Sequence, residues 1–233
     1  MAEIDTIMQV NRGVWIFQQL EDRLKMKLGW KHLYNQWFHL ACFRHRSTEW
    51  LNVDAINMHL TQSLELYPDT KVTQALFKCV KNAAELKQKA VEGKINGALI
   101  NPTMLVSPFQ VMVAANKAFH LHSIGNMKTR SLNSEIIFNL SPTNSISDAF
   151  KRFGISDRDD SALVVVVHGE DNELQAVSDI MAMVDGQQLP VDEISSLSDL
   201  EKIRKLYKVT PQEETCGTLL DAVVCRMAIK DVM

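Results

Sequence analysis

The sequence is poor in glycine and has no closely spaced cysteines. Its 233 residues include nine glycines and no G-x-G-x-x-G or G-x-x-x-x-G-K-[ST] motif. Loops that cradle phosphate need several neighbouring glycines so that backbone N–H groups can approach the ligand. We therefore expect no nucleotide-binding loop. The four cysteines (Cys42, Cys79, Cys216 and Cys225) lie at long, irregular spacings without a C-x-x-C pair, which argues against a zinc ribbon or a disulfide scaffold.

Long apolar runs are also missing. The longest strongly apolar run, Ala162 to Val167, has the length of a strand and falls well short of the roughly 18 residues of a membrane span. Glu3 and Asp5 stand where a secretory or organelle-transit peptide would be basic and poor in acids. These features and the cysteine pattern predict a soluble protein of the cytoplasm and nucleus, with no membrane partner.

Tryptophan is absent after residue 57. All four tryptophans lie in residues 1–57, which carry seven Lys/Arg and six Asp/Glu, whereas residues 58–233 carry 18 and 22. This change in composition predicts a boundary near Met58. We expect residues 1–57 to be an appended segment of unknown role, helical around Leu20–Leu28 or poorly ordered, and residues 58–233 to form the main domain.

The pattern of residues 58–233 mixes strand and helix signals. Alternating or β-rich segments predict strands at 59–66, 72–80, 95–100, 135–140 and 163–167. Helical spacing and capping residues predict helices at 82–92, 107–122, 145–153, 173–184, 197–207 and 211–229. Strands and helices intermingle without strict alternation, so we expect an α+β domain with a mixed, mainly antiparallel sheet flanked by helices.

No constellation argues for catalysis. His120 and His122 lie two residues apart on a predicted helix, where their side chains diverge, so a metal pair is not expected. Cys216 and Cys225 lie in an apolar C-terminal segment beside acids, which favours buried small hydrophobes over reactive thiolates. We expect a protein that is not an enzyme and needs no cofactor or metal. A small enzyme using cysteine or histidine chemistry stays as the least favoured alternative.

Acidic residues are absent from residue 93 to residue 134. This window contains residues that we expect to lie within reach of one another: Lys117, Lys128, Thr129 and Arg130. Clustered cations beside hydroxyl and amide groups suit a phosphodiester chain, because they offer both charge and hydrogen-bond donors. Few aromatic residues flank them, which favours a short single-stranded end over a duplex. The alternative is an acid-poor core helix followed by a solvated basic turn.

Several blocks in residues 58–233 carry a family resemblance. They are Ile100-Asn-Pro-Thr, Phe109-Gln, Val113-Ala-Ala-Asn-Lys117-Ala, Met127-Lys-Thr-Arg130, Glu135-Ile-Ile-Phe-Asn-Leu-Ser141, Phe153-Gly-Ile, Gly217-Thr-Leu-Leu-Asp-Ala222 and Arg226-Met. In this order they closely resemble the PRPK-binding protein family, the small kinase-binding subunits of the KEOPS (EKC) tRNA-modification complex. Met58 falls where such proteins usually begin, so residues 1–57 inherit nothing from the resemblance.

The resemblance implies a non-catalytic subunit of the machinery that installs threonylcarbamoyl on adenosine 37 of tRNAs reading ANN codons. It implies direct docking on the N-terminal lobe of the small PRPK-type atypical kinase/ATPase, with the other KEOPS subunits as indirect partners. Archaeal relatives hold the single-stranded 3′ CCA end of tRNA, and we assign that contact to Lys117, Lys128, Thr129 and Arg130. The alternative is a kinase-binding regulator that never touches RNA.

The kinase docking surface should consist of exposed apolar side chains. One candidate is the C-terminal helix with Leu219, Val223 and Met227, which follow one another at helical spacing. The alternative is that these three side chains fill the core of the domain.

Overall fold

The computed structural model describes residues 58–169 and 174–231. The described residues divide into two units between residues 203 and 204, and each is described by itself. The N-terminal segment 1–57, with the helix expected around Leu20–Leu28, lies outside the described residues.

The larger unit is built on a five-stranded sheet. Its strands are β1 (His59–Leu64), β2 (Tyr67–Lys78), β3 (Ala98–Ile100), β4 (Ser161–His168) and β5 (Gln187–Leu189). The strand order is β1-β2-β4-β3, and β5 pairs with the end of β2 beyond β1. Every one of these pairings is antiparallel. The expected α+β class with a mainly antiparallel sheet is therefore confirmed.

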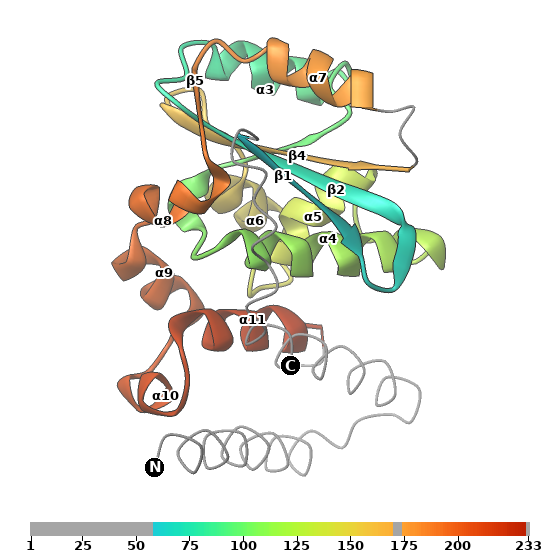
Figure 1. Ribbon diagram of the computed structural model, residues 1–233. Helices are drawn as coiled ribbons and strands as arrows, with labels where there is room; N and C mark the ends of the chain where they lie inside the picture. The colour runs from blue at the N-terminus through green and yellow to red at the C-terminus, as the bar shows by residue number, and fades with distance from the viewer. Residues whose placement is uncertain (1–57, 170–173, 232–233) are drawn as a thin grey trace, which may run out of the picture. The chain divides into compact units, whose positions relative to one another are not determined.

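Helices cover both faces of this sheet (Figure 1). One layer contains α3 (Ala83–Val91) and α7 (Leu174–Ala182). The other layer contains α4 (Pro108–Ser123), α5 (Leu132–Leu140) and α6 (Ile146–Phe153). Short helical turns complete the unit at η2 (Pro102–Met104), η4 (Val191–Glu193) and α8 (Ile194–Leu197).

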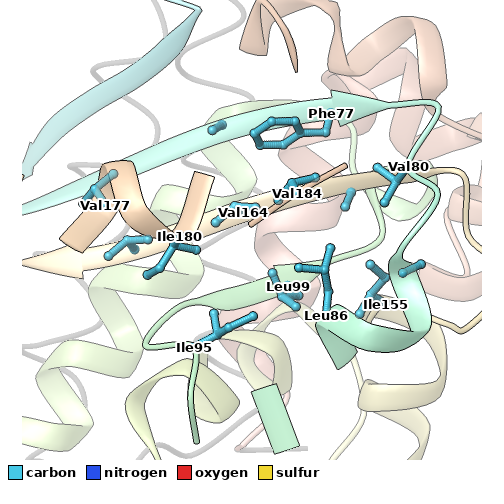
Figure 2. Close-up of a cluster of buried hydrophobic side chains, with 14 residues drawn as sticks. Phe77, Val80, Leu86, Ile95, Leu99, Ile155, Val164, Val177, Ile180 and Val184 are labelled. Carbon is cyan, nitrogen blue, oxygen red and sulfur yellow. The ribbon is translucent and has the colours of Figure 1, made fainter. Parts of the chain in front are cut away.

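The α3/α7 face of the sheet is mainly apolar, although Thr73 and His168 are also buried on it and share a hydrogen bond of 2.8 Å. A cluster of buried side chains from β2, β4, α3 and α7 gathers there (Figure 2), including Phe77, Leu86, Val164 and Ile180. In β4, residues 162, 164 and 166 belong to this cluster, while Leu163 and Val165 are buried on the other face. The valine run of β4 is thus a strand covered on both sides, as its composition predicts.

The opposite face, beneath α4 and α5, buries polar groups. They are Gln74, Gln110, Glu135, Asn139 and Ser141. Gln74 Nε2 donates to the carbonyl of Pro108 at 3.3 Å, and Gln110 Oε1 accepts from the backbone N–H of Val106 at 2.9 Å. Ser107 caps α4, its side chain accepting from the N–H of Phe109. These contacts fix the start of α4 on the sheet.

The segment 135–140 is helical, so the strand expected there is wrong. It forms most of α5, and all six of its residues are buried. Ser131 caps the helix by accepting from the N–H of Ser134. A short segment buried on every side shows no helical stripe, and an apolar run of this length cannot be assigned from periodicity. Packing against α4 and the serine cap decide the helix.

The smaller unit contains α10 (Pro211–Cys216) and α11 (Leu219–Ile229), and α9 (Leu200–Tyr207) crosses into it. The single helix expected over 211–229 is wrong. Gly217 is extended at φ −161°, and a capping box between Thr218 and Asp221 begins a new helix. The break exposes Cys216, which was expected to be buried, and Cys225 is partly buried.

No helix within residues 58–169 and 174–231 combines the length and apolar content needed to cross a bilayer.

Candidate nucleic-acid interface

The connection between α4 and α5 holds three of the four predicted RNA-binding residues. After α4, Gly125 adopts φ +68°, the left-handed conformation that glycine favours at helix ends. The N–H of Asn126 then donates to the carbonyl of Leu121 at 2.8 Å. The chain therefore leaves the helix sharply and enters the segment from Met127 to Arg130, which we call the basic turn.

Glu135, at the start of α5, holds the basic turn from below. Its carboxylate is fully buried. One oxygen, Oε2, accepts from the N–H of Lys128 at 3.1 Å, the N–H of Thr129 at 2.8 Å and the hydroxyl of Thr129 at 2.6 Å. Successive backbone N–H groups that converge on one anion form an anion-binding concavity. The backbone of the basic turn is thereby tied to α5.

The two cationic side chains of the basic turn are exposed. Lys128 Nζ lies 5.6 Å from the centroid of the Phe138 ring and 3.4 Å from Asn144 Oδ1. Within the part of the chain that the structure describes, the Arg130 side chain has no hydrogen-bond or ion-pair partner. The acidic residue nearest to the basic turn in the sequence is Glu135. Its carboxylate is buried and accepts hydrogen bonds from Lys128 and Thr129 on the inner side of the turn. The outer surface of the basic turn is consequently positive.

Thr129 and Lys117 are less exposed than Lys128 and Arg130. The hydroxyl and the N–H of Thr129 both point to Glu135, so this residue shapes the basic turn from inside. Lys117 lies on α4, outside the basic turn, and is partly buried. The structure thus places Lys128, Thr129 and Arg130 in one turn and Lys117 on α4.

The sequence reasoning missed Glu135 and the cap at Ser131. The start of the helix has a recognisable signal, because Ser131 is followed by Glu135 in the first helical turn, but that signal does not reveal the contacts of Glu135 with the basic turn. A serine cap with an acid in the first turn is a common start of a helix. The expected strand at 135–140 concealed it, since a strand would have placed Glu135 away from the turn before it.

A second polar cluster joins the β1–β2 hairpin to the end of α4. The hydroxyl of Tyr67 lies 2.9 Å from His120 Nδ1 and 3.0 Å from Ser123 Oγ. The Tyr67 ring packs edge-on against Phe119, with centroids 4.8 Å apart. His120 is therefore engaged with the hairpin, while His122 is exposed. Among the described residues, no group of three or more His, Cys, Asp or Glu is arranged to hold a metal ion.

The candidate kinase-docking side chains on α11 are mostly inaccessible. Val223 is fully buried and Met227 is 1% exposed, while Leu219 is partly buried. A stripe of apolar residues at helical spacing is the usual core-facing side of a helix. Val223 and Met227 are therefore less accessible than Leu219, which is the most accessible of the three.

Comparisons with known proteins give a consistent result. A family model described as "Kinase binding protein CGI-121" matches residues 77–231, all within the expected main domain. The EKC/KEOPS complex subunit TPRKB of Danio rerio is 65% identical over 175 residues, which cover 75% of this chain and 99% of the relative. The EKC/KEOPS complex subunit cgi121 of Aspergillus fumigatus is 35% identical over 141 residues, covering 58% of this chain and 75% of the relative. The EKC/KEOPS complex subunit cgi121 of Schizosaccharomyces pombe is 25% identical over 169 residues, which cover 70% of this chain and 97% of the relative.

Proposed function

Because the chain belongs to the CGI-121 family of kinase-binding proteins, we propose that it is a non-catalytic subunit of the EKC/KEOPS complex. In this role it binds the small atypical kinase/ATPase subunit and supports threonylcarbamoylation of adenosine 37 in tRNAs reading ANN codons. It acts in the cytoplasm and nucleus, and its own RNA contact is with the single-stranded 3′ CCA end of the tRNA. The alternative is a kinase-binding regulator without direct RNA contact.

The observation that carries the RNA contact is the basic turn. It presents the exposed side chains of Lys128 and Arg130 on a backbone that Glu135 holds in place. Lysine offers a point charge and arginine a planar fork of donors, and both suit phosphate oxygens. A short turn with two cations matches a few nucleotides, which is the length of a single-stranded tRNA end.

Within the predicted RNA-binding set we propose different roles for the four residues. Lys128 and Arg130 are the residues that we expect to contact phosphate. Thr129 keeps its donors directed at Glu135, so its contribution is to shape the basic turn. Lys117, partly buried on α4, is expected to contribute less than the two exposed cations.

The RNA contact is tested by the double variant Lys128→Glu/Arg130→Glu in the full chain. We expect tRNA binding to weaken by about tenfold or more. The slope of log affinity against log salt concentration should become shallower by the contribution of about two phosphate contacts. The matched control is Lys81→Glu/Arg158→Glu, an exposed lysine and an exposed arginine outside the basic turn, which changes net charge equally. Unchanged affinity in the basic-turn variant, with its fold intact, would favour the regulator without RNA contact.

Kinase binding is tested by co-purification of the full chain with the small kinase subunit. Leu219→Asp probes α11 with less risk to folding than Met227→Glu, because Leu219 is partly accessible and Met227 is buried. Loss of co-purification at an unchanged melting temperature would support a kinase contact at Leu219. Retained co-purification would remove Leu219 from the interface, and absence of kinase binding by the unmodified chain would contradict the proposed role.

A further inference from the structure

The strongest unassigned feature is the buried carboxylate of Glu135 beneath the basic turn. We propose that Glu135 is a positioning residue, which fixes the basic turn in its RNA-binding conformation before RNA arrives. This inference rests on the proposed RNA contact. RNA is an anion, so the charge of a nearby acid would by itself weaken RNA binding. The proposed positioning effect of Glu135 strengthens RNA binding instead.

The burial of Glu135 requires compensation. An ionised carboxylate is costly to remove from water unless it is hydrogen-bonded. Here the three hydrogen bonds to Oε2 come from Lys128 and Thr129, two consecutive residues of the basic turn. Hydrogen bonds to an ionised acceptor are about twice as strong as neutral ones. The hydrogen bonds that compensate for burial of the Glu135 carboxylate therefore also hold the backbone of the basic turn in place.

Arg130 lies between two residues whose positions are fixed by hydrogen bonds. On one side, Thr129 is held by Glu135 through both its N–H and its hydroxyl. On the other side, Ser131 is held as the cap of α5, because its hydroxyl oxygen accepts from the N–H of Ser134. The backbone of Arg130 lies between these two anchors, while its side chain is exposed. A cation on an ordered backbone loses less conformational entropy on binding than one on a free loop.

Removing the carboxylate should affect the basic turn more than α5. The first turn of the helix retains its cap at Ser131, which does not depend on Glu135. The second carboxylate oxygen, Oε1, is buried and has no hydrogen-bond partner among the described residues. The hydrogen bonds that the structure gives the carboxylate are therefore those to the basic turn. A purely structural role would change the stability of the protein and leave the RNA affinity of the folded chain unchanged.

The test compares Glu135→Ala and Glu135→Gln with Lys128→Glu/Arg130→Glu in the full chain, using a single-stranded RNA that ends in CCA. Loss of the acid removes negative charge, so simple electrostatics predicts tighter binding. Positioning predicts the reverse. We expect Glu135→Ala to bind about tenfold more weakly with an unchanged salt slope, because both cations remain. Glu135→Gln, which keeps one acceptor oxygen, should fall between Glu135→Ala and the unmodified chain.

Two further measurements keep the test decisive. Backbone N–H resonances of Lys128 and Thr129 should lose their protection from hydrogen exchange in Glu135→Ala, while those within α5 keep it. If Glu135→Ala fails to fold, Glu135→Gln and Thr129→Val decide the matter. Thr129→Val removes one donor to Oε2 and should weaken RNA binding about two- to fivefold.

The outcomes separate this inference from the proposed function. Weaker binding by the Glu135 variants and by the charge-reversal variant supports both. Binding by the folded Glu135 variants at or above the affinity of the unmodified chain, with weak binding by the charge-reversal variant, overturns the positioning role alone. Unchanged binding by the charge-reversal variant overturns the RNA contact and the positioning role together.

Discussion

The two faces of the sheet are packed in different ways. Beneath α3 and α7 lies a cluster of aliphatic and aromatic side chains (Figure 2), and the buried polar pair on that face, Thr73 and His168, is hydrogen-bonded within the sheet. Beneath α4 and α5, apolar packing is interrupted by buried Gln74, Gln110, Glu135 and Asn139. Apolar contacts are tolerant of small changes in orientation, whereas hydrogen bonds fix direction. The clustered apolar side chains beneath α3 and α7 stabilise the fold, and the hydrogen bonds of Glu135 on the other side set the geometry of the turn that carries the candidate site.

This difference explains how a turn with two exposed cations can lie above a buried acid. The positive groups of the basic turn face outward, and Glu135 binds the backbone of the same residues from inside. A surface cation on an unsupported loop would need ordering at the moment of binding. On the polar face, that ordering is already present in the free protein.

Truncation on the apolar face should have the largest effect on stability. Leu86 is fully buried in the cluster beneath α3. Leu86→Ala should lower the free energy of unfolding by about 2–5 kcal/mol, because it removes buried contacts and leaves a cavity. Denaturant unfolding measures this loss, and Ile180→Val, expected to cost about 0.5–1.5 kcal/mol, is the milder companion.

The same variants separate stability from RNA binding. At a temperature where Leu86→Ala is fully folded, its affinity for CCA-ending RNA should equal that of the unmodified chain. A loss as large as that expected of Glu135→Ala would show that the two faces do not have separate roles.

An apolar replacement on the polar face should have a smaller effect of the opposite sign. Asn139 is 1% exposed, and neither polar atom of its side chain has a hydrogen-bond partner in the described residues. Asn139→Leu has similar volume and should raise the free energy of unfolding by about 1 kcal/mol, since an unpaired buried amide is unfavourable. Thermal and denaturant unfolding measure it. Destabilisation by more than about 2 kcal/mol would mean that the amide satisfies a partner and belongs to the polar network.

The smallest effect is expected at Glu213 in the smaller unit, a surface counterpart of buried Glu135. Burial raises the pKa of Glu213, but hydrogen bonds from Thr210 and Arg226 outweigh it and lower the pKa from its ordinary 4.5. A lowered pKa stabilises the fold above that value, and the gain is lost as the pH falls through the folded-state pKa. Glu213→Gln should therefore cost about 0.5–1 kcal/mol near neutral pH and progressively less below about pH 4.5. Unfolding measured across this pH range contradicts the account if the difference persists in acid.

Much of the fold was predictable because its signals are local. The valine run of β4 predicts a strand buried on both faces, and Ser107-Pro108 with Gly125 marks the limits of α4. The break between α10 and α11 also has a local signal, since Thr218 and Asp221 have the spacing of a capping box. That signal was overridden by the continuous apolar pattern of the segment.

The role of Glu135 was not predictable from local pattern. Its contacts join the first turn of α5 to residues six and seven positions earlier, and they exist because α5 is a helix and the basic turn folds back on it. The positive character of residues 93–134 could be read directly, because it depends on composition. Which of the cations are exposed and which are partly buried, as Lys117 is, depends on tertiary packing.

The most direct test of the account is the affinity of the full chain for intact tRNA and for the same tRNA without its CCA end. Both should be measured with the unmodified chain and with Lys128→Glu/Arg130→Glu. The account predicts that removing CCA weakens binding by the unmodified chain and has little further effect on the variant, because both changes remove the same contact. Equal affinity of the unmodified chain for the two tRNAs would contradict it.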